Sequence, residues 1–195
     1  MPEQLNLVDH GDSVAKAAFR MLLDDPQPLP MRLIASRLEL DPGFVSRALD
    51  GLTAVGRAET REGELLGVYG LTLKPTQHSL ELGEKQYYTW CAFDIVGIPA
   101  ALGASARVSS RCGGCDREIR FEIADGDVPA LPLVISWLSR ECDSIRADFC
   151  PSVNFFCDHE EYAAAAAAKK APTGSLTLEQ AASMGRENWG WARSE

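Results

Sequence analysis

The sequence lacks an excess of basic residues and has no long apolar run. Its 195 residues include 19 Lys and Arg against 28 Asp and Glu, which gives a formal net charge of −9. Nucleic-acid binders depend on Lys and Arg contacts with phosphates, so we expect no nucleic-acid partner. No apolar stretch reaches the roughly 18 residues of a membrane span, and residues 1–4 lack the features of a secretion signal. We therefore expect a cytoplasmic protein with no membrane partner.

Histidine is scarce, with 3 residues, whereas cysteine occurs 6 times. The cysteines are residues 91, 112, 115, 142, 150 and 157. Disulfides form in oxidising compartments, and nothing in the sequence directs the chain to one. We expect the cysteines to be thiols, metal ligands or catalytic groups, not a disulfide framework.

The first 75 residues combine helical periodicity with two short extended runs. Asp41 followed by Pro42 is typical of a helix start, and Gly56 of a helix end. We expect a loose tail over residues 1–12, helices over 13–23, 31–38 and 42–55, and strands over 57–61 and 65–73. This order predicts a winged-helix-like three-helix domain over residues 1–75, with Pro75 close to the boundary.

The surface of that predicted domain is poorly suited to DNA. The third helix offers Ser46 and Arg47, but it also carries Asp41 and Asp50. The wing would present the carboxylates of Glu59, Glu62 and Glu64, which repel phosphate. We therefore favour a domain used for packing, while DNA binding stays the alternative.

Residues 76–195 mix apolar helices with alternating strands. A buried helix is expected over 88–98, stopped by Pro99, and alternation predicts a hairpin of strands 104–110 and 117–124. Further strands are expected over 131–138 and 153–156, a helical turn over 143–149, and helices over 160–170 and 176–191. The fold class is therefore α+β: the winged-helix-like domain, then a small mixed or antiparallel sheet with flanking helices.

Cys91 and Asp94 lie in an apolar stretch together with Trp90 and Phe93. On a helix, Cys91 and Asp94 would be three residues apart and project from the same face. Apolar surroundings raise the pKa of a carboxyl, so Asp94 could hold a proton near neutral pH and exchange it with the thiol. The alternative is a small buried cysteine beside a surface aspartate. Cys150 lies between Phe149 and Pro151, but spacing alone does not place it near Cys91.

The segment from Cys112 to Cys115 has the Cys-x-x-Cys spacing of a zinc knuckle or a redox motif. A second pair with this spacing is missing, although Cys157 and His159 would complete a conceivable ligand set. A redox motif usually opens a helix, whereas this one is expected in a hairpin turn. We favour a plain turn with one buried cysteine, and expect Cys142 and Cys157 to be incidental.

Residues from about 67 to 156 resemble the organomercurial (alkylmercury) lyase family. The resemblance is carried by Tyr69–Leu73, Tyr88–Asp94, Ala106–Cys112 and Phe149–Cys150 with Val153–Phe156. It implies that Cys91 and Cys150 bind mercury, that Asp94 is the catalytic acid beside the product Hg(II), and that Cys112 is structural. The family also begins with a winged-helix-like domain. Pro151 stands where the family pattern has a second cysteine, which is not thought essential.

The resemblance further implies protonolytic cleavage of a carbon–mercury bond, giving a hydrocarbon and Hg(II) held by two cysteines. No cofactor is expected. The substrates would be small organomercurials, Trp90 and Phe93 would form the apolar wall of the substrate pocket, and small thiols would assist release. A mercuric reductase is a conceivable acceptor of Hg(II). The alternatives are a metal-sensing winged-helix regulator and a mercury or zinc carrier without turnover.

Overall fold

The chain is helical from Pro2 onward in the computed structural model, which describes residues 2–193. The N-terminal helices are α1 (Pro2–Asp24), α2 (Met31–Leu38) and α3 (Pro42–Ala54). The predicted loose tail over residues 1–12 is therefore wrong from residue 2. Asp12 forms an ion pair at 2.6 Å with Lys16, one helical turn later, and such pairs favour a continuous helix.

The starts and ends of α2 and α3 follow the sequence signals. The Asp41 carboxylate accepts a hydrogen bond from the Phe44 N–H at 2.9 Å, and Pro42 occupies the first turn of α3. Gly56 has a φ of 71°, as expected for a residue just after a helix. The hairpin that follows consists of β2 (Ala58–Arg61) and β3 (Glu64–Val68), and β1 (Leu29–Pro30) pairs with β3.

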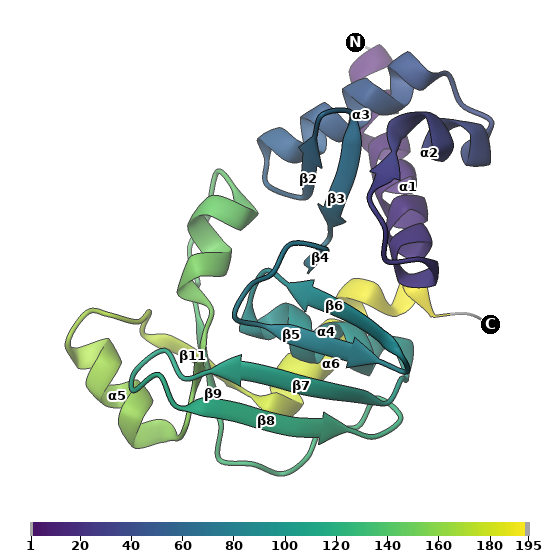
Figure 1. Cartoon of the computed structure of the whole chain (residues 1–195). Coiled ribbons are helices and arrows are strands. Elements are labelled where there is room, and N and C mark those ends of the chain that lie inside the picture. Colours follow the sequence, from purple (N-terminus) through teal and green to yellow (C-terminus); the bar gives the residue numbers. More distant parts are fainter. Residues whose placement is uncertain (1, 194–195) are drawn as a thin grey trace.

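Within the described residues, the larger sheet has eight strands and is antiparallel throughout (Figure 1). Its order is β1-β3-β4-β6-β5-β7-β8, with β2 also paired to β3. The further strands are β4 (Leu71–Thr72), β5 (Ser79–Leu82), β6 (Lys85–Thr89), β7 (Ala106–Arg111) and β8 (Glu118–Ile123). Because β4 pairs with β6, the sheet is continuous across the domain boundary that was expected close to residue 75.

Two predicted segments around this sheet need correction. The run expected as one strand over 65–73 is broken between β3 and β4, because Tyr69 and Gly70 both have positive φ. The helix expected over 88–98 is α4 (Ala92–Leu102), and residues 88–89 belong to β6. Aromatic and β-branched residues favour strands, which accounts for the error at residues 88–89. Pro99 lies inside α4, which ends at Gly103 with a φ of 63°.

A smaller antiparallel sheet covers part of the C-terminal half, with three strands within the described residues in the order β10-β9-β11. Its strands are β9 (Val134–Trp137), β10 (Phe155–Phe156) and β11 (Gly174–Thr177). The remaining helices are π-helix η1 (Ile145–Phe149), 3₁₀ helix η2 (Cys150–Ser152), α5 (His159–Ala167), α6 (Leu178–Trp189) and 3₁₀ helix η3 (Gly190–Ala192). The mixed α+β class is confirmed, although β1, β5, β6 and β11 were not predicted and the strands expected over 131–138 and 153–156 are shorter.

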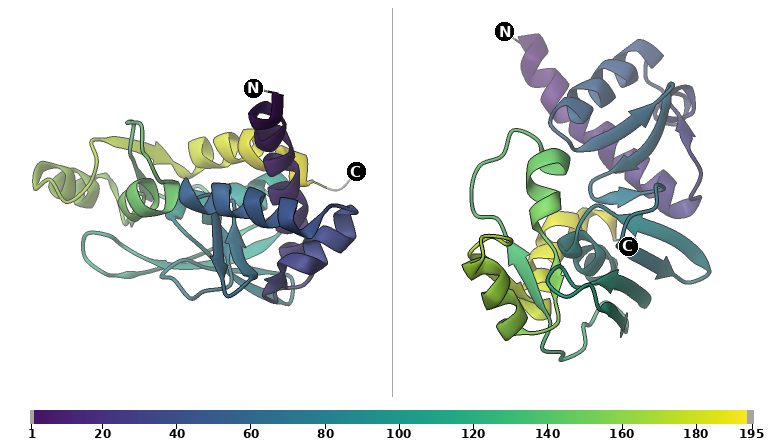
Figure 2. Two further views of the ribbon diagram at one scale, coloured as in Figure 1. Left: turned by 90° about the horizontal axis from the view of Figure 1, so that it is seen from above. Right: turned by 60° about the vertical axis from the view of Figure 1, so that its left-hand side comes forward.

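Helices α4 and α6 pack closely against each other on one side of the larger sheet (Figures 1 and 2). Residues 92–101 of α4 are all buried, so this helix is the centre of the core. Gly97 of α4 meets Gly185 of α6: a Cβ added to Gly185 would lie 2.7 Å from the Gly97 carbonyl oxygen. A Cβ on Gly97 would lie 2.6 Å from the Trp189 ring. The two glycines therefore set the distance between the helices.

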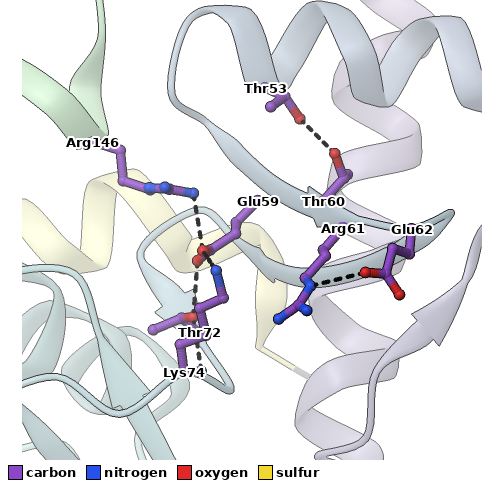
Figure 3. A network of polar contacts seen from close by, with 8 residues as sticks. All are labelled: Thr53, Glu59, Thr60, Arg61, Glu62, Thr72, Lys74 and Arg146. Atoms are coloured by element: carbon purple, nitrogen blue, oxygen red, sulfur yellow. Dashed lines mark hydrogen bonds and ion pairs between the residues drawn. The ribbon is translucent and has the colours of Figure 1, made fainter.

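A buried carboxylate joins the N-terminal hairpin to the segment that precedes Cys150 (Figure 3). Glu59 of β2 is 6% exposed, forms ion pairs with Lys74 at 2.6 Å and Arg146 at 3.3 Å, and accepts a hydrogen bond from Thr72. The expectation that Glu59 faces phosphate from a wing is therefore wrong. Buried charge needs partners, and here Thr72 and Lys74 come from β4 and the residues just after it, whereas Arg146 comes from the C-terminal half of the chain.

Within residues 2–193, no helix is long and apolar enough to cross a membrane.

Substitution of Gly185 by Ala tests the helix contact. The new methyl group would press on the α4 backbone, and overpacking of this kind costs about 1–3 kcal/mol. For a chain of this size that is a fall of roughly 2–10 °C in Tm. Gly190→Ala is the matched control, because nothing lies within 4 Å of its Cβ position. Thermal unfolding followed by circular dichroism checks the pair, and equal Tm values would contradict the tight crossing.

Candidate functional site

Cys91 and Asp94 meet at the start of α4, where each satisfies the backbone of the other. Cys91 is the residue immediately before the helix, and its N–H donates to Asp94 Oδ2 at 3.1 Å. The Asp94 N–H in turn faces the Cys91 sulfur, which completes a capping box. The two residues were expected on the face of a continuous helix. The structure brings them together by a different route, because Cys91 is extended, with φ −151° and ψ 174°.

Cys150 approaches this pair from the other half of the chain. It opens η2, and Val153 at the end of that turn accepts a backbone hydrogen bond from Ala92 at 3.1 Å. That bond holds the Cys150 segment against the first turn of α4. One ligand atom each from Cys91, Asp94 and Cys150 lies within 4.8 Å of the others. All three residues are buried, and sequence spacing could not place Cys150 here.

Burial dominates the acid–base properties of the three groups. It raises the pKa of Asp94 to about 7, although hydrogen bonds from the Cys91 side chain and from the backbone of Cys91 and Trp90 act in the opposite direction. Burial also raises the pKa of Cys91 well above its ordinary value, helped by its hydrogen bond with Cys150 and by the charge of Asp94. Asp94 can therefore either accept or donate a proton near neutral pH, and Cys91 is a thiol until it finds an acceptor.

Gly70 forms one wall of this site. Its φ is 89°, and a Cβ at this position would lie 2.5 Å from Asp94 Cγ. The Gly70 carbonyl accepts a hydrogen bond from the Trp90 N–H at 2.9 Å, and the Tyr69 carbonyl accepts one from Trp189 Nε1 at 3.0 Å. Gly70 was not predicted as a site residue. Its signal was a glycine that interrupts an extended run, which is typical of a close backbone approach.

A cavity of about 440 Å³ opens beside Asp94 and Cys150. Trp90 and Phe93, which were expected as its apolar wall, both line it. The aromatic part of the lining extends to Trp137, Phe149, Trp189 and Trp191, none of which was predicted. The Phe93 ring centroid lies 5.2 Å from that of Trp137 and 5.3 Å from that of Trp189.

Other residues of the cavity lining are polar and come from α1 and from the segments on either side of the β2–β3 hairpin. Asp12, Lys16 and Arg57 line it, together with Tyr69. The Tyr69 hydroxyl donates to the Asp12 carboxylate, and Lys16 pairs with the same carboxylate. Burial, followed by the bond to Asp12, raises the pKa of Tyr69. Sequence reasoning missed these residues, because no local pattern links α1 to the start of α4.

A second group of sulfur atoms lies at the turn between β7 and β8. Ligand atoms of Cys112, Cys115 and Cys157 fall within 4.8 Å of one another, and the described residues place no His159 atom in that group. Cys112 is 3% exposed, as expected for one buried cysteine in a turn. Cys157 was expected to be incidental, but it belongs to this group, because its sulfur lies 3.7 Å from that of Cys115. Cys142 lies outside both groups.

The raised pKa of Asp94 makes stability depend on pH. Between about pH 4 and pH 7 the folded chain holds a proton on Asp94 that the unfolded chain has released, so the folded state loses stability as pH rises through this range. Asp94→Asn removes the effect but keeps an acceptor for the Cys91 N–H. We expect the free energy of unfolding of the variant, relative to that of the parent, to be higher at pH 8 than at pH 5 by on the order of a few kcal/mol. The Tm of the variant should rise relative to the parent in the same direction. The exposed Asp50, changed to Asn, is the control; a pH-independent difference for Asp94→Asn would contradict the assignment.

Comparison with known proteins identifies the family of the chain. The family model described as alkylmercury lyase matches residues 71–190. The alkylmercury lyase of Staphylococcus epidermidis is 34% identical over 162 residues, 78% of this chain and 74% of that protein. The alkylmercury lyase of Pseudomonas putida is 37% identical over 107 residues, 53% of this chain and 50% of that protein. A crystal structure of the mercury-bound form of MerB2 has the same fold, with a TM-score of 0.83, 19% identity, and coverage of 94% of this chain and 92% of that one. The chain therefore belongs to the alkylmercury lyase family.

Proposed function

We propose that this protein cleaves the carbon–mercury bond of organomercurials by protonolysis, and that Cys91, Asp94 and Cys150 carry the reaction. The observation that carries the proposal is the buried group of two thiols and one carboxyl within 4.8 Å. Thiolates bind mercury, a soft metal, far better than oxygen or nitrogen ligands do. A carboxyl with a pKa of about 7 can supply the proton that the carbon atom needs to leave.

The reaction begins with proton transfer from sulfur to oxygen. The Asp94 carboxylate accepts the proton of the Cys91 thiol, and the resulting thiolate bonds to mercury. Cys150 then adds as a second thiolate, its proton passing to the displaced anionic ligand of the substrate or to solvent. The second thiolate increases electron density on mercury and weakens its bond to carbon.

Proton transfer to carbon completes the reaction. Asp94 donates its proton to the carbon atom, the electron pair of the carbon–mercury bond becomes the new C–H bond, and a hydrocarbon leaves. Hg(II) stays bound to the Cys91 and Cys150 sulfurs, with Asp94 beside it. Because the groups are already held together, proton transfer is effectively intramolecular, which is a large source of rate. No cofactor takes part in this scheme.

The aromatic lining of the cavity would receive the organic group. Trp90 and Phe93 both shortly precede Asp94 in sequence and line the cavity together with it. Trp137 and Trp189, whose rings contact Phe93, extend this apolar surface. An apolar wall favours binding of an alkyl or aryl group and excludes water from the reacting atoms.

The N-terminal part of the chain would complete the site instead of binding nucleic acid. We propose a winged-helix-like unit over residues 1–75, followed by the catalytic domain over 76–195. The unit supplies Asp12, Lys16 and Arg57 to the cavity lining, and its hairpin buries Glu59 against Lys74 and Arg146. These residues line the cavity or pack against the rest of the chain instead of forming a surface for DNA, which favours a lyase over a metal-sensing regulator. A cytoplasmic location, in which small thiols remove Hg(II) and a mercuric reductase accepts it, fits the chemistry.

The direct test is release of benzene from phenylmercury. The parent protein, incubated anaerobically with phenylmercury and excess small thiol, should release benzene measured by gas chromatography. Asp94→Asn should still bind mercury but lose at least ~100-fold in rate, since general acid–base groups contribute roughly 10²–10⁴-fold. Cys150→Ser should lose both rate and retention of Hg(II).

The variants separate the alternatives. Benzene release by Cys150→Ser at the parental rate would refute the scheme with two thiolates. No benzene from the parent, with mercury bound tightly, would instead indicate a carrier or a sensor. In that case retention on heparin at low salt would distinguish a DNA-binding sensor from a carrier.

Gly70→Ala tests whether the tight approach of the 69–70 turn positions Asp94. The methyl group would lie 2.5 Å from Asp94 Cγ, so the carboxyl must move and the rate of benzene release should fall by roughly 100-fold, as expected for a displacement of about 1 Å. Gly63→Ala is a matched control, because Gly63 has a φ of 82° but nothing lies within 4 Å of its Cβ position. Both variants carry the backbone strain of an alanine at positive φ, and equal rates in the two would show that the contact with Asp94 is unimportant.

A further inference from the structure

Three thiols meet outside the proposed catalytic site, where the two sheets approach each other. Cys112 and Cys115 belong to the turn after β7, and Cys157 follows β10 directly. Their sulfur atoms all lie within 4.8 Å of one another, and all are free. The proposed cleavage of the carbon–mercury bond makes no use of this group.

The spacing of the sulfur atoms suits a tetrahedral metal ion. Zinc binds thiolate sulfur at about 2.3 Å, and two ligands of a tetrahedral ion at that distance lie roughly 3.8 Å apart. The Cys115 and Cys157 sulfurs are 3.7 Å apart. The chain can therefore offer three ligands with little movement of its backbone.

The turn also offers hydrogen bonds that stabilise thiolate. Backbone N–H groups of Cys115, Gly114 and Cys157 face the Cys112 sulfur. The thiolate is the form of cysteine that binds a metal ion.

We propose that Cys112, Cys115 and Cys157 bind one zinc ion, with the fourth position facing solvent. On binding, the thiols release their protons to solvent and all three sulfurs ligate the metal as thiolates. Cys115 is exposed, so water can reach the fourth position. The Glu161 side chain lies beside this turn, with its Cγ 2.8 Å from the position that a Cβ on Gly114 would take.

A metal here would act on the segment that carries Cys150. The turn and β10 are already in backbone contact, through the Gly113 N–H bond to the Phe155 carbonyl at 2.7 Å and a bridge between Cys112 and Phe155. Zinc would add a link from Cys112 and Cys115 to Cys157, seven residues after Cys150. It would thus hold the short connection between the two sites in place.

Cobalt(II) substitution tests the site directly. The reduced, metal-stripped full chain should bind one equivalent of Co(II), with visible bands typical of tetrahedral coordination and a thiolate-to-cobalt band in the near ultraviolet. Zn(II) should displace the cobalt. Cys115→Ser and Cys157→Ser should each weaken binding by ~100-fold or more, because even residues that only orient ligands cost about 10–100-fold.

Matched variants separate this site from the catalytic one. Cys142→Ser is the control for loss of a partly exposed cysteine, and Cys91→Ser for loss of the catalytic thiol; both should bind Co(II) as the parent does. Circular dichroism of each variant shows whether it has folded. Retention of the thiolate band in both Cys115→Ser and Cys157→Ser, or its loss in Cys91→Ser, would overturn the proposal, whatever the result with phenylmercury.

Thermal unfolding gives an independent readout. At a free Zn(II) concentration about 100 times its dissociation constant, the parent Tm should rise by roughly 5–10 °C. The rise should disappear in Cys157→Ser and persist in Cys142→Ser. A parent Tm unaffected by Zn(II) would contradict a site that is occupied in the folded state.

Discussion

The capping box at the start of α4 is the interaction on which the site depends. Helix α4 lies at the centre of the core, and a buried helix must satisfy the N–H groups of its first turn. Asp94 accepts from the Cys91 N–H, while Val153 accepts from Ala92, so two of the acceptors near this turn come from residues close to the Cys91 and Cys150 sulfurs. The groups that bring Cys91, Asp94 and the Cys150 segment together are therefore also the groups that allow the helix to start. The geometry of the proposed catalytic group and the folding of α4 are coupled at this one point.

The same position explains how a buried carboxyl can remain useful. Desolvation alone would keep Asp94 protonated, but hydrogen bonds from Cys91 and Trp90 oppose it, and the N-terminus of a helix favours negative charge. The resulting pKa of about 7 is suitable for a group that must first accept a proton and then donate it. Removing the carboxyl from this turn, without changing its burial, would leave it protonated and unable to accept the thiol proton.

Local sequence patterns predicted the parts of the fold that local interactions determine. The start of α3 at Asp41 and Pro42 and the β7–β8 hairpin are examples, since turn and capping residues decide both. Cys91 and Asp94 could be paired for a related reason, because a separation of three residues brings side chains together on a helix and also in a capping box. The approach of Cys150 and the Cys115–Cys157 contact could not be derived, because each depends on how distant strands pair. Residues 88–89 were assigned to a helix because the apolar character of the segment outweighed their preference for strands.

The cavity gives a physical reason for the contact between the N-terminal part of the chain and the proposed catalytic residues. Most of its aromatic lining comes from residues after 89, whereas Asp12 and Lys16 of α1 and Arg57 before β2 add polar side chains. A cavity assembled in this way is incomplete without the N-terminal part of the chain, and the Glu59 ion pairs with Lys74 and Arg146 join the β2–β3 hairpin to later segments. Arg146 also lies over the Trp90 ring, 5.9 Å from its centroid, so a shift of the hairpin would reach the cavity wall through one side chain. Loss of the N-terminal unit should therefore impair substrate binding before it impairs the chemistry of Cys91 and Asp94.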